Sequence, residues 1–398
     1  MASRRPKVFV VVNTVTPYTS ALYAAVTRRG SVDLMVLYCS QTHRNRPEGW
    51  RNFRRGYVSE VLSGVHLYVR GDARDPYHLN LSIIRLIAKR HPDVLVIHGY
   101  GDLTNLLVIT FARIAGIPYV LSIDGGDIKS TPRIAQYIVR SIVRGAGAFT
   151  VGGSSAEKLL LRYGAPRERL FPLLVATDLQ DIHSMAMSLR MESASRLPVQ
   201  RENTSGTILF VGRLVPEKGV LDLIGAFRRL HHEDRDLRLV IVGRGPLKEE
   251  LQKATQGMIA GSVVFIDHLQ EVDFIRTLST SGVLVLPSHN EPLGIVSLEA
   301  FVAGIPVVLS DVCGSVGTLP DSPWVTIFPA GNIESLTLSI RKALNLRLNG
   351  LESGHLSQIR DFLKENSLDR QAEAFEAAIR TALQTCSSPA NRAGKVST

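Results

Sequence analysis

Two acidic residues eight positions apart, Glu291 and Glu299, stand in the part of this sequence that offers the most chemistry. The apolar run Val283 to Leu286 predicts a strand, which turns and enters a helix near Gly294. Free backbone amides in the first turn of such a helix bind anions, and Leu293 and Gly294 lie where a phosphate would come close. Glu291, at the rim of the loop, can accept hydrogen bonds from sugar hydroxyls, and Glu299 can bind a second diol such as a ribose.

Two cations precede these acids. Arg213 lies two residues after the predicted strand Ile208 to Val211, and Lys218 follows five residues later, before the next helix. Arginine presents a fork of donors and lysine a point charge, a combination that suits a diphosphate. Gly243 also follows a strand, where a glycine lets backbone approach a ligand.

Each of these residues has an ordinary alternative role when taken singly. The cations can be loop residues, Glu291 a helix-capping acid, Glu299 a solvated helix residue, and Gly243 part of a tight turn. Their joint order, each after a strand, favours a site for a nucleotide-activated sugar.

Short β-branched runs alternate with helix-like stretches along most of the chain, which predicts an α/β fold with parallel sheets covered by helices on both faces. The predicted strands are Val8 to Asn13, Val32 to Cys39, Val94 to His98, Tyr119 to Asp124, Ala148 to Val151, Ile208 to Val211, Leu237 to Val242, Val263 to Ile266, Val283 to Leu286 and Pro306 to Leu309. In doubly wound sheets, ligands bind beyond the carboxyl ends of the strands. We therefore expect the loops named above to form the site.

The length and the two series of strands predict two doubly wound, Rossmann-like domains rather than one. The polar stretch after residue 192 is typical of a linker. We predict a first domain over 1–192, a linker over 193–206, a second domain over 207–367, a terminal helix over 368–386, and a flexible tail over 387–398. The sequence does not decide which domain receives the terminal helix, and packing back on the first domain is one of the two options.

Charge is unevenly distributed along the chain. Residues 1–200 hold 26 Lys and Arg against 14 Asp and Glu, and the remainder holds 20 against 22. A cationic half suggests an anionic partner or simply a solvated basic surface.

Three scattered cysteines argue against structural zinc and for a reducing compartment. With no long apolar span evident, we expect a cytoplasmic protein, attached at most peripherally to the inner face of the cell membrane.

Residues 207 to 313 resemble the retaining glycosyltransferases of family four, which have the two-domain GT-B fold. The resemblance rests on Gly212-Arg213-Leu214 with Glu217-Lys218-Gly219, on Leu239 to Pro246, on Glu291 to Glu299, and on Gly304 to Val308. It implies that Arg213 and Lys218 hold the donor diphosphate, that Glu291 faces the transferred sugar and that Glu299 binds the ribose. It also implies a donor and an acceptor held across a cleft between the domains, with no metal ion and no cofactor.

The first half departs more from that family pattern. The loop after the first strand, Asn13 to Tyr18, resembles a subgroup of polysaccharide-building enzymes. Asp124 takes the place where many members have a histidine, and either orients the acceptor or serves as a weak base, or only forms a turn. Asn13, Tyr18 and His98 are further acceptor-side candidates, although a single histidine such as His98 is more often structural.

The segment His43 to Tyr57 mixes arginines with aromatic residues, which fits a lipid headgroup interface better than nucleic acid, since no nucleic-acid module accompanies it. Its cations are Arg44, Arg46, Arg51, Arg54 and Arg55.

Taken together, these features and the family resemblance predict a retaining transfer of a hexosyl unit to a glycan or lipid-linked acceptor in cell-surface polysaccharide or glycoconjugate synthesis. A nucleotide-sugar epimerase of similar fold and a non-catalytic sugar-nucleotide sensor are the alternatives.

Overall fold

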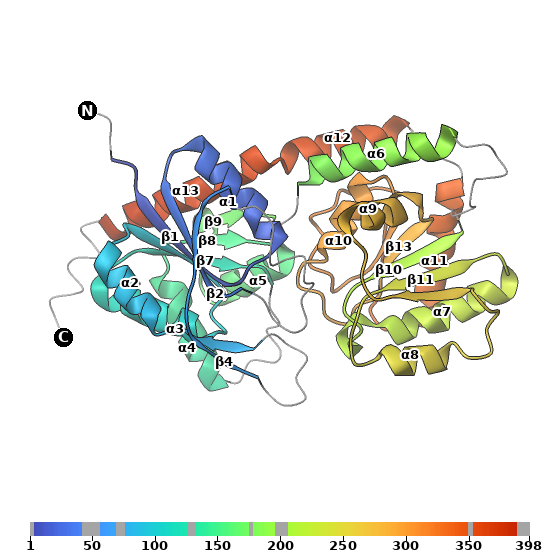
Figure 1. Ribbon diagram of the computed structural model, residues 1–398, viewed down its shortest axis with the longest axis horizontal. Coiled ribbons are helices and arrows are strands. Elements are labelled where there is room, and N and C mark those ends of the chain that lie inside the picture. The colour runs from blue at the N-terminus through green and yellow to red at the C-terminus, as the bar shows by residue number, and fades with distance from the viewer. Residues whose placement is uncertain are drawn as a thin grey trace. The chain divides into compact units, whose positions relative to one another are not determined.

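The computed structural model describes residues 4–41, 56–68, 76–125, 133–174, 178–195, 206–348 and 353–387. These form two compact units, each built on its own parallel sheet, as the alternation of strands and helices predicts (Figure 1). The first unit comprises Met1–Thr177 together with Leu368–Thr398, and the second comprises Asp178–Ser367. We refer to them as the first and second domains.

The first domain contains a seven-stranded parallel sheet in the order β3-β2-β1-β6-β7-β8-β9. Its strands are β1 (Lys7–Thr14), β2 (Asp33–Ser40), β3 (Val58–Val61), β6 (Val94–His98), β7 (Tyr119–Ile123), β8 (Ala148–Val151) and β9 (Leu170–Pro172). The inner strands are buried on both faces, which explains why they appear in the sequence as nearly continuous apolar runs.

Helices cover both faces of this sheet. One face packs against α2 (Ser82–Arg90), α3 (Leu103–Ala115), α4 (Arg133–Gly145) and α5 (Ser154–Arg162). The other face packs against α1 (Pro17–Arg29) and the terminal helix α13 (Leu368–Ser387). Between β3 and α2 the chain forms a small antiparallel pair, β4 (Val65–Leu67) with β5 (Tyr77–Leu79), which the sequence patterns did not predict.

The terminal helix α13 returns to the first domain, although it follows the whole of the second in sequence. Its apolar residues Phe375, Ile379 and Ala382 are buried beside the sheet. Arg29 of α1 donates hydrogen bonds to Glu376 (3.2 Å) and Glu373 (3.3 Å) of this helix. The helix therefore completes one of the two layers that cover the first sheet.

The second domain contains a six-stranded parallel sheet in the order β12-β11-β10-β13-β14-β15. Its strands are β10 (Thr207–Val211), β11 (Arg238–Val242), β12 (Val263–Ile266), β13 (Val283–Leu286), β14 (Val307–Ser310) and β15 (Val325–Phe328). Its helices are α6 (Leu179–Ser195), α7 (Val220–Glu233), α8 (Lys248–Ala254), α9 (Glu271–Thr280), α10 (Ile295–Val302), α11 (Ile333–Leu348) and α12 (Ser353–Glu365).

The division between the domains differs from the predicted one. It falls at residues 177 and 178, so α6 belongs to the second domain, where it packs on α9 and α10. Arg190 of α6 fixes this packing, because it donates to the carbonyl oxygens of Ser279 (3.0 Å) and Gly304 (2.9 Å). The predicted first domain, 1–192, is therefore too long by most of a helix, and the predicted linker does not mark the boundary.

Candidate functional site

In each sheet the strand order reverses at the first strand, because later strands are added on both sides of it. β1 lies between β2 and β6, and β10 lies between β11 and β13. At such a switch point the loops leave the carboxyl ends of two neighbouring strands toward opposite faces, which opens a crevice for a ligand. The predicted site residues that the structure describes lie at these two edges, which we name after the roles that the sequence predicts for them: the acceptor edge (β1, β6, β7) and the donor edge (β10, β11, β13).

The donor edge is centred on one ion pair. Lys218, in the loop after β10, donates from Nζ to Oε2 of Glu291, in the loop after β13, at 2.5 Å. Both side chains are mostly shielded, at 13% and 14% exposure, so water screens their attraction less than at an open surface. Arg213 lies in the same loop as Lys218 and is exposed. The two charges that the sequence placed 73 residues apart thus meet in space.

Backbone contacts hold the two loops of this edge together. The carbonyl oxygen of Glu217 accepts hydrogen bonds from the amides of His289 (2.8 Å) and Asn290 (3.1 Å). The His289 ring lies 3.0 Å from Asp222 of α7. Lys218 and Glu291 are therefore carried by loops whose relative position is fixed independently of their own side chains.

Two glycines of the donor edge are required by close backbone approach. At Gly219 the backbone is left-handed (φ +63°), and a Cβ would lie 2.0 Å from the carbonyl oxygen of Pro287. At Gly243 (φ +151°) a Cβ would lie 1.8 Å from the carbonyl oxygen of Gly212. Any larger residue would push these loops apart. Gly243 thus has a packing role whether or not a ligand approaches it.

The helix α10 begins where the sequence predicts. Gly294 is its N-terminal cap in a left-handed conformation (φ +69°), and the Ser297 hydroxyl donates to the Gly294 carbonyl oxygen (2.6 Å). Leu293, just before it, is half-buried. Glu299 is 5% exposed, so it is not the solvated helix residue of the ordinary alternative. A carboxylate buried this deeply depends on neighbouring protein groups, rather than on bulk water, for its hydrogen bonds.

The acceptor edge brings three predicted residues together. Asn13 lies near the end of β1, His98 ends β6, and Asp124 follows β7. Asn105 of α3 connects the first two, because its amide donates to the Asn13 side-chain oxygen (3.2 Å) and to the His98 carbonyl oxygen (2.6 Å). The apolar composition of α3 hid Asn105 from the sequence analysis. A buried amide within an apolar helix is the signal that would have found it.

His98 has a second partner that the sequence analysis missed. Its Nε2 lies 2.8 Å from the hydroxyl of Tyr23, a fully buried residue of α1. Burial lowers the pKa of His98, and the nearby Asp124 opposes this shift. Burial likewise raises the pKa of Asp124, and His98 opposes that shift. Both directions favour the uncharged forms, which can exchange hydrogen bonds with a hydroxyl.

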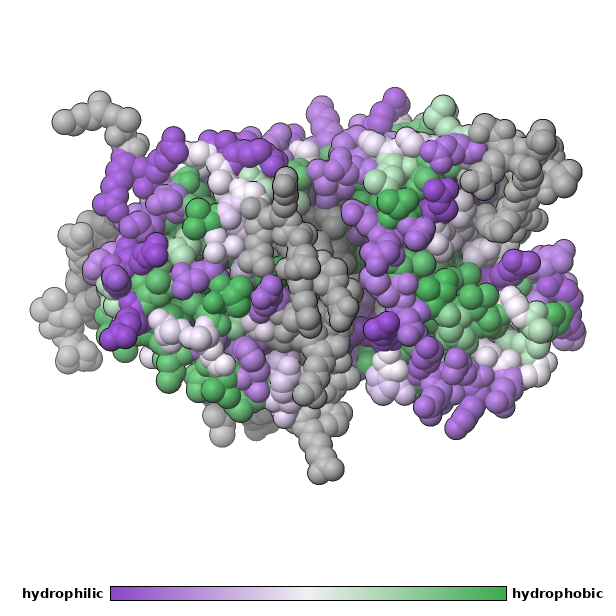
Figure 2. Space-filling view, in the orientation of Figure 1, coloured by the Kyte–Doolittle hydropathy of each residue, from purple (hydrophilic) through white to green (hydrophobic). Residues whose placement is uncertain are grey.

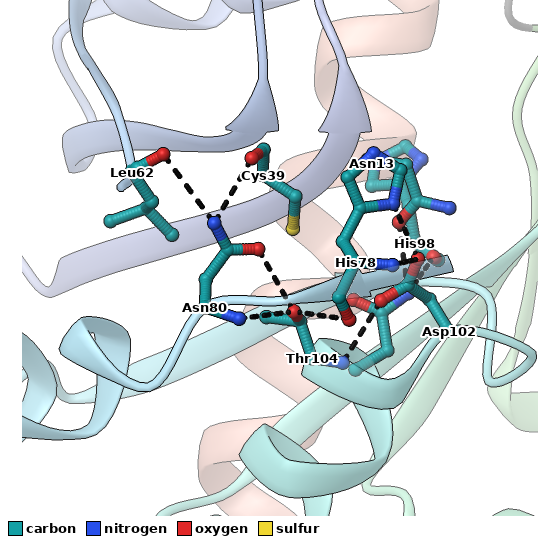
Figure 3. A network of polar contacts seen from close by, with 9 residues as sticks. Asn13, Cys39, Leu62, His78, Asn80, His98, Asp102 and Thr104 are labelled. Atoms are coloured by element: carbon teal, nitrogen blue, oxygen red, sulfur yellow. Dashed lines mark hydrogen bonds and ion pairs between the residues drawn. The ribbon is translucent and has the colours of Figure 1, made fainter. Parts of the chain in front are cut away.

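A buried polar network supports the loop that follows His98 (Figure 3). Asp102 caps α3 by accepting from the Thr104 amide (2.9 Å), and its other oxygen accepts from the His78 amide (3.0 Å) and contacts His78 Nδ1 (2.7 Å). The Thr104 hydroxyl in turn lies 3.0 Å from the Asn80 side chain. This network ties the β5 strand to the start of α3 and so fixes the loop from His98 to Asp102.

Several predicted residues receive no structural account. The side chain of Tyr18 and the arginines Arg44, Arg46, Arg51, Arg54 and Arg55 lie outside the described residues.

Within the described ranges, no three His, Cys, Asp or Glu side chains are grouped to hold a metal ion. In the same part of the chain, no helix has the length and apolar character to span a membrane. The visible face of each domain mixes hydrophilic with apolar residues (Figure 2).

Comparison with known families covers most of the chain. The family model described as "Glycosyl transferase 4-like domain" matches residues 4–173, and the model described as "Glycosyl transferases group 1" matches residues 194–360. The second match includes every predicted residue of the donor edge. The first includes every predicted residue of the acceptor edge.

Individual relatives are distant. An uncharacterised glycosyltransferase of Methanocaldococcus jannaschii is 27% identical over 232 residues, which are 55% of this chain and 58% of that protein. The 2-deoxystreptamine glucosyltransferase of Streptomyces kanamyceticus is 25% identical over 277 residues, which are 65% of this chain and 70% of that protein. The match to the archaeal relative thus spans less than two thirds of its length.

Among solved structures, Anabaena HepE in complex with UDP and glucose aligns with 98% of this chain and 100% of its own, at a TM-score of 0.63 and 15% identity. A likeness at this identity concerns the fold. It places both domains of the chain in one known two-domain architecture.

Proposed function

We propose that this chain, which belongs to the glycosyl transferase group 1 family and has the GT-B fold, is a retaining, metal-independent hexosyltransferase. It would move a hexosyl unit from a nucleoside diphosphate sugar to a glycan or lipid-linked acceptor in the synthesis of cell-surface polysaccharide or glycoconjugate. The observation that carries this proposal is the shielded pair of Lys218 and Glu291 at the switch point of the second sheet.

Charge on the donor edge matches what departure of a diphosphate requires. As the bond between the sugar and the diphosphate breaks, negative charge grows on the phosphate oxygens, and fixed cations stabilise that charge most where water is partly excluded. Lys218 and Arg213 are the cations proposed for this role. The amides at Gly294 and Leu293, which open α10, would receive the second phosphate.

The two acids are assigned to the donor's hydroxyl groups. Glu291 would bind hydroxyls of the transferred sugar once the diphosphate draws Lys218 toward itself, and Glu299 would bind the ribose. HepE, with UDP and glucose in its structure, supports a nucleoside diphosphate hexose as the donor class. On the acceptor edge, Asp124 and His98 would orient the attacking hydroxyl, with Asn13 beside them.

A first experiment establishes the donor. Binding of a ligand to the native state raises the unfolding temperature, so uridine, guanosine and adenosine diphosphate sugars are compared by thermal shift. Incubation of the best donor alone tests the epimerase alternative, because only an epimerase would change the sugar without an acceptor. Binding without transfer to any glycan or lipid-linked acceptor would favour a sensor.

A second experiment tests the diphosphate assignment. Lys218→Ala should lower kcat/KM by about 100-fold or more, the size of effect seen when one stabiliser of developing charge is removed. The exposed Lys253→Ala on α8 is the matched control and should leave transfer unchanged. Transfer near the native rate in a folded Lys218→Ala protein would contradict the proposal.

A further inference from the structure

The exposed face of α3 and α4 in the first domain combines large apolar side chains with arginines. Ile114 is 81% exposed at the end of α3, and Tyr137 and Ile138 are 74% and 53% exposed on α4. Arg140 and Arg144 are exposed on the same helix. In Figure 2, apolar residues reach the surface over α3 and α4 at the lower left. Such side chains gain free energy only where they leave water.

The two helices form one continuous surface. Arg113 of α3 donates to the Ser141 hydroxyl of α4 at 2.9 Å, which holds the helices side by side. A shallow depression lies between them, lined by Arg113, Tyr137, Arg140, Ser141, Arg144 and Gly145. Three guanidinium groups therefore surround one hollow. We call this surface the α3–α4 patch and include Ile114 and Ile138 in it.

The charge of these helices has one sign. α3 and α4 together contain four arginines and no Asp or Glu. The opposite face of α4 is occupied by Val139, Ile142 and Val143, which are buried in the core. The exposed face therefore lies outside the apolar core, and no acidic side chain of α3 or α4 neutralises its arginines.

We propose that the α3–α4 patch docks on an anionic lipid surface. The depression would receive a phosphate-bearing headgroup, since arginine binds phosphate as a two-pronged donor. Tyr137, Ile138 and Ile114 would enter the boundary between headgroups and acyl chains, where rings with a polar tip and aliphatic side chains are both stabilised. A nucleic acid would use the arginines but would leave the two isoleucines in water. This inference is independent of the proposed transferase activity.

The test uses the full chain and vesicles, with co-sedimentation as the measurement. Vesicles of phosphatidylcholine mixed with phosphatidylglycerol should bind the protein, and vesicles of phosphatidylcholine alone should not. Arg113→Gln/Arg140→Gln/Arg144→Gln should weaken binding on the order of 100-fold, since each cation near an anionic surface contributes about 1 kcal/mol. A control that loses the same charge from the second domain, Arg229→Gln/Arg235→Gln/Arg360→Gln, should bind as the native protein does; all three of its arginines are exposed.

A second variant separates a lipid surface from other anions. Ile114→Ser/Tyr137→Ser/Ile138→Ser keeps every charge and should still lose most vesicle binding. If only the arginine variant lost binding, and millimolar inorganic phosphate displaced the protein from vesicles, the patch would be a phosphate site and the lipid proposal would be wrong. Native binding by both variants would also overturn it, as would binding that depends instead on Arg44, Arg46, Arg51, Arg54 and Arg55. Circular dichroism verifies that each variant is folded.

Discussion

Acid should destabilise the second domain through His355, a buried residue of α12. Its ring stacks on Trp324 with centroids 4.1 Å apart and planes within 5°, and it meets Phe301 of α10 edge-on at 5.2 Å. Burial lowers the pKa of His355 from 6.5 to about 4. The imidazole is therefore neutral in the folded domain at neutral pH, where it packs as a flat apolar ring between Phe301 of α10 and Trp324 in the turn before β15.

Two further influences act on this pKa. The cations Arg190 and Arg347 also disfavour a charged ring, and Gln358 opposes the shift in part. Because the folded pKa lies below the unfolded one, the unfolded chain binds a proton between these two values and the folded chain does not. Stability is thus complete above the unfolded pKa and falls as the pH drops from about 6.5 toward 4.

The magnitude follows from the difference between the two pKa values. About 2.5 pKa units at about 1.36 kcal/mol each gives on the order of 3 kcal/mol for the whole window. About 2 kcal/mol of this is lost by about pH 5. A loss of this size is a substantial part of the free energy of unfolding of an ordinary domain.

The assay can be restricted to the second domain. The sequence has two tryptophans, so Trp50→Phe leaves Trp324, in contact with His355, as the single reporter. Urea unfolding of this protein at neutral and mildly acidic pH, followed by fluorescence, gives the free energy at each pH. His355→Leu should remove about 2 kcal/mol of the pH dependence, and the exposed His232→Gln should remove none. An unchanged pH dependence in His355→Leu would refute the reasoning.

Three other substitutions test the two edges. Glu291→Gln releases Lys218 and should tighten binding of a free nucleoside diphosphate several-fold, by about 1 kcal/mol, while transfer falls; isothermal titration and a transfer assay separate the two effects. Gly219→Ala would bring a Cβ against the Pro287 carbonyl oxygen and should lower the free energy of unfolding by about 1–3 kcal/mol, measured by urea unfolding. Asp102→Ala removes a helix cap and a buried acceptor of the acceptor edge and should cost about 3 kcal/mol or more, with faster hydrogen exchange across β5 and the start of α3.

Apart from Val263–Ile266, the strands that the sequence predicted lie in the interior of the two sheets. Val94–His98, Ala148–Val151 and Val283–Leu286 match the structure at both ends, and so does the edge strand Val263–Ile266. The short strands β3, β9 and β15 were missed, because three or four residues at or near a sheet edge carry too little apolar pattern to distinguish them from loops. The domain boundary was misplaced for a related reason, since the composition of α6 does not reveal which sheet its buried face meets.

The sequence likewise identified the candidate site residues that follow strands and missed those that helices contribute. The donor edge is built from loops that directly follow strands, so Lys218 and Glu291 could be identified from their place in the pattern. The acceptor edge depends on side chains that helices contribute from a distance. Tyr23 of α1 reaches His98 across 75 residues of sequence, and Asn105 reaches Asn13 across 92. No periodicity within either helix marks these residues as polar partners.

The two edges differ in charge in the way that the proposed reaction requires. On the donor edge the shielded ion pair holds the Lys218 ammonium in place before a ligand binds, so a cation would be available to a leaving group that gains negative charge. On the acceptor edge, burial shifts the pKa values of both His98 and Asp124 toward the uncharged forms. An attacking hydroxyl is neutral and is best oriented by dipoles, because a full charge beside it would hold water that competes with it. The same order of the inner strands in each sheet thus carries an ion pair in one domain and, in the other, two titratable groups whose pKa values burial shifts toward the uncharged forms.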